Sequence, residues 1–130
     1  MILVDSSVWI DHFRSGNRTL ADLLAEEQVL LHPFIIGELV LGGLPGGVGH
    51  VEALLDMPSA TPADDDEVLL FIQHHALTGR GIGYGDAHLL ASTRLTPSAA
   101  LWTRDRRLLT VARTLGLAAD VEPSTGFQED

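Results

Sequence analysis

Short apolar runs alternate along the chain with longer segments in which apolar residues recur at helical spacing. The short runs are typical of buried strands and predict strands at 2–5, 29–32, 59–60, 99–103 and 118–122. The longer segments predict helices at 7–13, 19–28, 33–43, 46–57, 61–79, 86–95 and 105–116. Because strands that alternate with helices form parallel sheets covered by helices on both faces, the pattern predicts an α/β fold.

The helix at 61–79 carries the clearest end markers. Thr61 is the predicted cap, Pro62 the first helical residue and Gly79 the end. The acids at 64–67 then fall near the start of the helix, where the helix dipole favours negative charge. We interpret this acidic run as a solvated helix start rather than a site.

Length and composition fit one domain. The 130 residues, 45% of them hydrophobic, suffice to bury a core, and we expect one domain at 1–123 with a loose tail at 124–130. The absence of cysteine excludes disulfides and thiolate metal ligands and suits a reducing cytoplasm. Because no segment has the pattern of a secretory signal or the apolar length of a membrane span, we expect a soluble, cytoplasmic protein.

Net charge limits the choice of partners. Eighteen acids face only eight basic residues, all of them arginine, and the formal net charge is −10 at pH 7. Taken alone, this charge opposes binding to a polyanion such as RNA. The objection weakens if several acids share divalent cations and if arginines gather where a phosphate backbone would lie.

Three acids stand alone among uncharged residues. Asp5 ends the first strand, Glu38 lies among apolar residues of a helix, and Asp86 follows closely after two glycines at a helix start. Each has a structural alternative, because Asp5 and Asp86 are placed to cap helices and Glu38 to pair with an arginine. Together they favour a site, since a carboxylate in apolar surroundings is costly unless it is paired or binds a metal.

A fourth acid, Asp105, also follows a predicted strand directly. Its arginine neighbours allow it an exposed ion pair, but its position matches that of Asp5, and two such strand ends can be neighbours where ligands bind in an α/β sheet. Four clustered carboxylates repel one another, and a cation offsets the repulsion. Ligation by oxygen alone points to Mg²⁺ or Mn²⁺ rather than to zinc.

Histidines and glycines suggest no further site. His74 and His75 are adjacent on a helix, so their side chains point about 100° apart and a shared metal is not expected. His88 is assigned no role. The glycine-rich stretch at 41–50 lacks the Lys-Ser/Thr ending of a P-loop, and we interpret it as a connection between helices.

Four segments, in this order along the chain, resemble one known family. VDSSVWID at 4–11, IIGELVLG at 35–42, YGDAHLLAS at 84–92 and LWTRDRRLL at 101–109 are similar to PIN-domain ribonucleases, specifically the toxins of VapBC toxin–antitoxin pairs. The resemblance spans almost the whole chain and implies a PIN-like α/β/α sandwich, with a central parallel β-sheet flanked by helices. It also implies a Mg²⁺- or Mn²⁺-dependent endoribonuclease that leaves 5′-phosphate and 3′-hydroxyl ends.

The resemblance also implies roles for individual residues. By position, the family's catalytic and metal-binding acids correspond to Asp5, Glu38, Asp86 and Asp105. Ser7 and Thr103 match the hydroxyl residues that orient the carboxylates or bound waters. The chain departs from some relatives after Asp105, where Arg106 and Arg107 stand in place of a further acid, so a second metal is less well held.

Basic and apolar surfaces suggest the partners. Arg104, Arg106 and Arg107 are candidates for RNA phosphate contacts, with Arg14 and Arg18 as further candidates, although an arginine-rich helix start is also a common solvated feature. Several apolar helices in so short a chain leave exposed patches. These suit a homodimer and a VapB-like antitoxin, both of which the family also implies.

Two other functions remain open on the sequence alone. A phosphatase with Asp5 as nucleophile usually carries a second Asp two residues later, where this chain has Ser7. A non-catalytic PIN-like binding module is expected to lose one or more of the four acids, and none is missing here.

Overall fold

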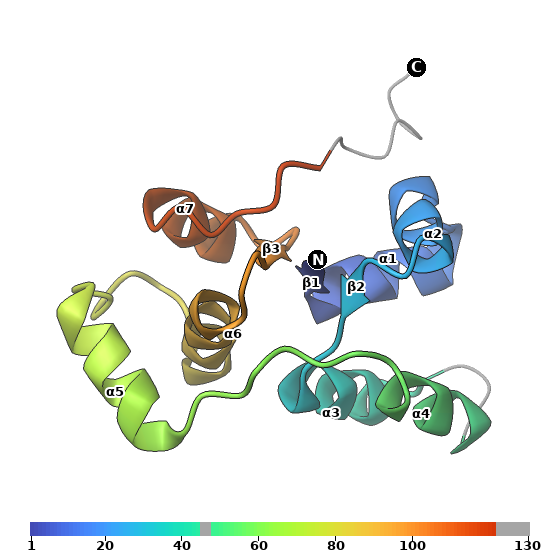
Figure 1. Cartoon of the computed structure of the whole chain (residues 1–130), viewed down its shortest axis with the longest axis horizontal. Helices are drawn as coiled ribbons and strands as arrows, with labels where there is room; N and C mark the ends of the chain where they lie inside the picture. Colours follow the sequence, from blue (N-terminus) through green and yellow to red (C-terminus); the bar gives the residue numbers. More distant parts are fainter. Residues whose placement is uncertain (45–47, 122–130) are drawn as a thin grey trace.

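A three-stranded parallel sheet organises the chain. The computed structural model describes residues 1–44 and 48–121 (Figure 1). The strands lie in the order β2–β1–β3 and comprise β1 (Ile2–Val4), β2 (Val29–Leu30) and β3 (Ala100–Trp102). Leu3 and Val4 of the central strand are fully buried, which explains why its sequence is continuously apolar.

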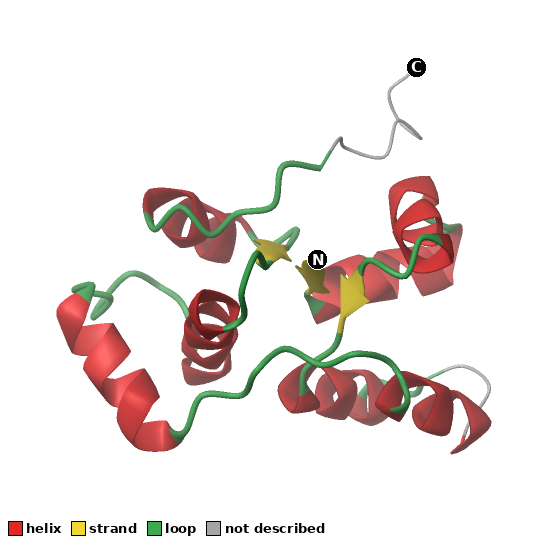
Figure 2. Cartoon of the chain, in the orientation of Figure 1, coloured by secondary structure: helices red, strands yellow, loops and turns green. Residues whose placement is uncertain are grey.

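Helices cover the sheet on both sides. The described residues form α1 (Ser6–Ser15), α2 (Arg18–Ala25), α3 (Pro33–Leu41), α4 (Val48–Leu55), α5 (Asp65–His74), α6 (Tyr84–Leu95) and α7 (Arg106–Thr114). In Figure 1 the strands lie near the centre, with α2 and α7 on one side and α3 and α6 on the other. Helices make up most of the structure (Figure 2). The predicted α/β/α arrangement around a parallel sheet is therefore confirmed.

Two predicted strands are reduced to single bridges at the sheet edges. Leu31 pairs with Ser59 and Leu101 pairs with Ala118, both in parallel. The prediction of a strand over 118–122 is wrong for the described residues 118–121. Pairing with β3 stops after the Ala119 amide has donated to the Leu101 carbonyl. Residue 122 and the predicted tail at 124–130 lie outside the described residues.

Helix α5 begins later than predicted. Asp64 is its cap: the Oδ1 atom of Asp64 accepts the Glu67 amide at 2.8 Å, and Oε1 of Glu67 accepts the Asp64 amide at 2.9 Å. The amide of Thr61 instead donates to Oγ1 of Thr96 at 2.8 Å. This tertiary bond keeps Thr61 and the proline after it outside the helix, so the predicted cap is wrong.

The end of α5 and the start of α6 also differ from the predictions. After the last helical residue, His74, the chain reaches Ala76, whose φ of 52° lies in the left-handed region and stops the helix before Gly79. Helix α6 starts at Tyr84, two residues before its predicted start. In the part of the chain that the structure describes, no helix is both long and apolar enough to cross a membrane.

Candidate active site at the carboxyl edge of the sheet

The topology brings the predicted acids to one edge of the sheet. Asp5 follows β1 directly, and its amide donates to the Trp102 carbonyl of β3 at 2.9 Å. Asp105 follows β3 and precedes α7, while Glu38 lies in α3 and Asp86 in the first turn of α6. Parallel pairing of β1 with β3 therefore places Asp5 beside the segment that leads to Asp105.

Asp5 is buried and held by two hydroxyl groups. Its side chain is 6% exposed, and its Oδ2 atom accepts hydrogen bonds from Ser7 Oγ at 2.8 Å and Thr103 Oγ1 at 2.7 Å. The side chain makes no capping bond to α1, so the capping alternative for Asp5 is wrong. The two hydroxyls in turn accept the amides of Arg104 and Asp105, each at 3.0 Å. One carboxylate is thus fixed between two segments distant in sequence.

Asp105 has a structural role of its own. Its Oδ1 atom accepts the amides of Arg107 and Leu108, each at 3.0 Å, and so caps α7. The ion pair considered for Asp105 with Arg104, Arg106 or Arg107 is not formed among the described residues, and Arg104 instead contacts Oδ2 of Asp11 at 2.9 Å. Capping by one oxygen fixes the direction in which Asp105 points.

Asp86 is close to two other acids of the site. Burial raises its pKa, the hydrogen bond from the Gly83 amide to Oδ2 at 3.0 Å opposes this, and the charges of Asp5 and Asp105 raise the pKa further. The Asp86 carboxylate accepts the amide of Gly83, the residue before α6. Asp86 therefore caps α6 and is also acted on by the charges of other acids.

Glu38 completes the electrostatic cluster. Glu38 is an exposed residue, but the protein around its carboxylate partly desolvates it and raises its pKa; a hydrogen bond from Ser6 lowers the pKa, and the charges of Asp5 and Asp86 raise it. The charges of Asp5 and Asp86 therefore act on Glu38, and the charges of Asp5 and Asp105 act on Asp86. Glu38 and Asp86 are thus each acted on by two of the other predicted acids.

The chemistry of this group suits a hard divalent cation. Its side chains offer carboxylate oxygens, the donors that Mg²⁺ and Mn²⁺ prefer, and a cation would offset the repulsion that adds to desolvation in raising the pKa of Glu38 and Asp86. Within residues 1–44 and 48–121, no three side chains of His, Cys, Asp or Glu converge closely enough to chelate a metal. The acids thus fit a cation by charge and donor type.

Two site groups were not predicted from the sequence. Ser6 bonds Glu38, and the backbone amide of Gly83 bonds Asp86. Ser6 stands beside Asp5 in the sequence, and the pair of serines after a strand-ending acid is the feature that would have pointed to it. A backbone amide leaves no comparable mark in the sequence.

The arginines predicted to contact RNA phosphates flank Asp105 at the start of α7. The Arg107 side chain packs over Gly81, where a Cβ would lie only 2.8 Å from Cδ of Arg107, and the φ of +79° at Gly81 also favours glycine. Arg104 is held by Asp11, as described above. Arg106 and Arg107 are exposed at the start of α7, immediately after Asp105.

A mostly apolar cleft opens beside Glu38. It has a volume of about 270 Å³ and is lined by α1, α3 and the residues after α3, namely Ile10, Phe13, Arg14, Glu38, Leu39, Gly42, Gly43 and Leu44. The side chains of Ile10 and Phe13 are 42% and 37% exposed. An apolar surface therefore adjoins one of the four acids.

Known proteins resemble this chain in sequence and in structure. The PIN domain family matches residues 2–114. Ribonuclease VapC32 of Mycobacterium tuberculosis is 40% identical over 124 residues, which cover 95% of this chain and 100% of the relative. Two solved structures share the fold: VapBC-1 from nontypeable Haemophilus influenzae, with a TM-score of 0.64 and 18% identity over 91% of this chain and 96% of that chain, and FitAcB from Neisseria gonorrhoeae, with 0.58 and 20% over 87% and 94%.

Proposed function

The chain belongs to the PIN-domain family and, within it, to the VapC ribonucleases, and on this premise we propose that it is a divalent-metal-dependent endoribonuclease acting as the toxin of a toxin–antitoxin pair. The proposal rests on one observation above all: Asp5 and Asp105 follow paired parallel strands at the carboxyl edge of the sheet, and their charges act on Asp86, while those of Asp5 and Asp86 act on Glu38. Mg²⁺ or Mn²⁺ is the proposed cofactor, and the cytoplasm, where cellular RNA is made and used, is the proposed location.

The residues of the site suit phosphodiester hydrolysis by water. A bound divalent cation supplies activation of water and neutralises charge that develops on the phosphate. Asp5 provides a carboxylate whose orientation is fixed by Ser7 and Thr103, which limits reorganisation during the reaction. The Ser7 hydroxyl donates to Asp5 and accepts the Arg104 amide, so the proposed role of Ser7 is to orient the carboxylate. Glu38 and Asp86 complete the charge that attracts the cation.

The alternatives from other classes fit less well. Position 7, where an aspartyl phosphatase usually has its second acid, holds a serine whose hydroxyl orients Asp5. A non-catalytic binding module is expected to lose one or more of the four acids, and this chain has an acid at each of the four positions. Purified chain freed of antitoxin should cleave structured cellular RNA with Mg²⁺ or Mn²⁺ and should not do so in EDTA; well-folded protein that fails to cleave with metal would exclude the nuclease.

RNA phosphates are the proposed ligands of Arg106 and Arg107, with Arg104 contributing when it exchanges Asp11 for phosphate. Arg107→Ala should raise KM for RNA about threefold to tenfold with little change in kcat, because the side chain lies at the rim and touches none of the acids. The salt dependence of log KM should also fall by about one unit of slope.

Arg113→Ala is the matched control for this test. Arg113 is exposed on the last turn of the same helix, α7, so its loss removes the same charge at a distance from the acids. Equal effects of the two substitutions on KM would contradict a local phosphate contact and would leave only a change in net charge.

The antitoxin is the proposed occupant of the cleft between α1 and α3. The cleft is mostly apolar and Glu38 forms part of its wall, so a segment seated there with apolar side chains would cover the active site. Arg14, also in the wall, offers a charge to an acidic residue of the partner. Occupation of the cleft would therefore inhibit the nuclease by exclusion of RNA.

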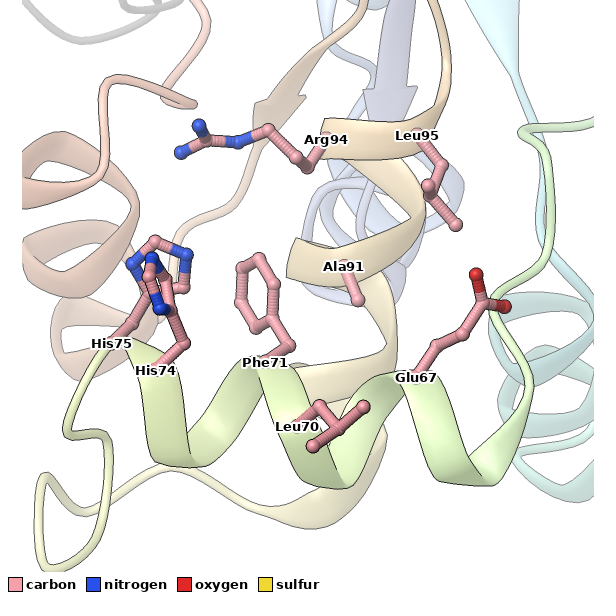
Figure 3. Close-up of a pocket in the computed structure, with 8 residues that line it drawn as sticks. All are labelled: Glu67, Leu70, Phe71, His74, His75, Ala91, Arg94 and Leu95. Carbon is pink, nitrogen blue, oxygen red and sulfur yellow. The ribbon is translucent and has the colours of Figure 1, made fainter.

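A second copy of the chain is the proposed occupant of another groove, between α5 and α6. This groove measures about 450 Å³ and is lined by Glu67, Leu70, Phe71, His74, His75, Ala91, Arg94 and Leu95 (Figure 3). Glu67 lies at one end and His74, His75 and Arg94 at the other, with apolar side chains between them. Two copies related by a two-fold axis would set the acidic end of each groove against the basic end of the other.

Substitutions in the two surfaces should separate the two partners. Leu70, which is 65% exposed in the lining of the groove, changed to Glu should convert a dimer into a monomer in sedimentation experiments, because the charge would be buried at the interface. Phe13→Ala should weaken antitoxin binding about tenfold or more in calorimetry and leave the dimer intact. Each variant is the control of the other, and a Leu70→Glu protein that remains a dimer would refute the proposed interface.

A further inference from the structure

A buried histidine caps α3, the helix that carries Glu38. His32 stands directly before α3, is 2% exposed, and accepts the Phe34 amide at its Nδ1 atom at 3.0 Å. Because Pro33 has no amide hydrogen, Phe34 offers the first donor of the helix. Acceptance at Nδ1 requires that the neutral ring carry its proton on Nε2.

The second ring nitrogen of His32 bonds α6, the helix that carries Asp86. Nε2 of His32 lies 3.2 Å from Oγ of Ser92, which is fully buried, so the Nε2 proton is donated to this hydroxyl. The same Oγ accepts the amide of Ala63, in the segment before α5, at 3.2 Å. One imidazole therefore fastens the start of α3 to the buried face of α6, in a region where water does not compete for the bonds.

This bridge joins the two helices whose acids interact. Glu38 lies further along α3 and Asp86 earlier on α6, and the charge of Asp86 acts on Glu38. A shift of α3 against α6 would change the spacing of these two carboxylates. Neither His32 nor Ser92 contacts one of the four acids, so any effect they have on the site passes through the helices.

We propose that the His32–Ser92 bridge positions Glu38 against Asp86, and thereby sets the affinity of the acidic site for its divalent cation. The proposal rests on the proposed function of that site. It assigns His32 and Ser92 as positioning residues, not as ligands. Burial lowers the pKa of His32 to about 4, so the neutral tautomer that makes both bonds is the form present at physiological pH.

Two substitutions of His32 separate the cap from the bridge. His32→Asn keeps a short side-chain acceptor for the Phe34 amide but cannot reach Ser92, whereas His32→Gln keeps a donor near Ser92 and loses the cap. Ser92→Ala removes the bridge from the other helix. Asn17→Ala is the control, because Asn17 is also buried and caps α2 through the Leu20 amide at 3.0 Å, and α2 carries none of the four acids.

Binding of Mn²⁺ without RNA is the measurement, followed by electron paramagnetic resonance, with kcat and melting temperature measured alongside. His32→Asn and Ser92→Ala should each weaken Mn²⁺ binding about tenfold and lower kcat, and the double variant should lose no more than either one. His32→Gln and Asn17→Ala should lower the melting temperature while the Mn²⁺ affinity stays within about twofold of the unchanged protein.

The outcomes separate this inference from the proposed function. If folded His32→Asn and Ser92→Ala bind Mn²⁺ as tightly as the unchanged chain, or if Asn17→Ala weakens binding equally, the positioning role is overturned. If the unchanged chain binds no Mn²⁺, the metal site of the proposed function fails first. Non-additive loss confined to the bridge variants supports the positioning role.

Discussion

Replacement of Asp5 by Asn should lower kcat for RNA cleavage at least about a hundredfold while the protein stays folded. Asn has nearly the same shape, so Ser7 and Thr103 can still donate to its remaining oxygen, but the variant lacks the negative charge and the second acceptor oxygen. Since Asp5 is the acid held most rigidly, its loss removes the best-ordered part of the proposed metal site.

The same variant should show how much repulsion among the acids destabilises the folded chain. Without metal, Asp5→Asn should melt at or above the temperature of the unchanged chain, because Asp5 no longer repels Glu38 and Asp86. Addition of Mn²⁺ should raise the melting temperature of the unchanged chain and raise that of the variant much less. A variant that loses activity and stability together, with or without metal, would indicate a structural role for Asp5 instead.

Asp56→Asn controls for the removal of one negative charge. Asp56 is an exposed acid just beyond α4, away from the strand ends that form the site. It should retain the kcat of the unchanged chain and its full stabilisation by Mn²⁺. If Asp56→Asn matched Asp5→Asn in either measurement, net charge rather than the site would explain the result.

The sequence predicted the three paired strands of the sheet more accurately than the pairing at the edges of the sheet. The three strands that pair were predicted because their apolar runs are buried on both faces, as Leu3, Val4 and Leu101 are. At the edges, pairing is limited to the bridges at Ser59 and Ala118, and no local pattern records how many bonds an edge will form. The predicted start of α5 was wrong for a related reason. A tertiary hydrogen bond from the Thr61 amide to Thr96 keeps Thr61 out of the helix, and Asp64 is the cap instead.

Two of the four predicted acids stand out in the sequence because of their surroundings. Asp5 and Glu38 lie in apolar stretches, but only Asp5 is buried in the structure and Glu38 is exposed, so the roles of the four acids stay a prediction. Asp105 shows that capping and clustering are compatible, because one carboxylate oxygen suffices to cap α7.

The bridge between His32 and Ser92 was not predictable in the same way. Its partners are 60 residues apart, and both lie within patterns that read as ordinary strand and helix. Only the placement of His32 before a proline that starts a helix hints at a cap. Long-range bonds of this kind support a site without leaving a motif.

Mild acid should destabilise the chain through His32. Its pKa is about 4 in the folded protein, lowered by burial and by the neighbouring His88, and 6.5 in the unfolded chain. The folded pKa is the lower one, so the contribution of neutral His32 to stability is fully present above pH 6.5. It declines as the pH falls from 6.5 towards 4, because in this range His32 takes up a proton mainly in the unfolded chain. Between pH 7 and pH 5 this amounts to about 2 kcal/mol.

Urea denaturation of the unchanged chain and of His32→Gln at both pH values isolates this contribution. The unchanged chain should lose about 2 kcal/mol more than the variant on going from pH 7 to pH 5, since glutamine does not titrate. Glu38 and Asp86 act in the opposite direction, because their raised pKa makes the folded chain bind protons first, but His32→Gln keeps the donor to Ser92 and so the spacing of these acids, and their effect cancels in the difference. Equal losses in the two proteins would mean that His32 is protonated without unfolding, and that the bonds to Phe34 and Ser92 do not hold the ring neutral.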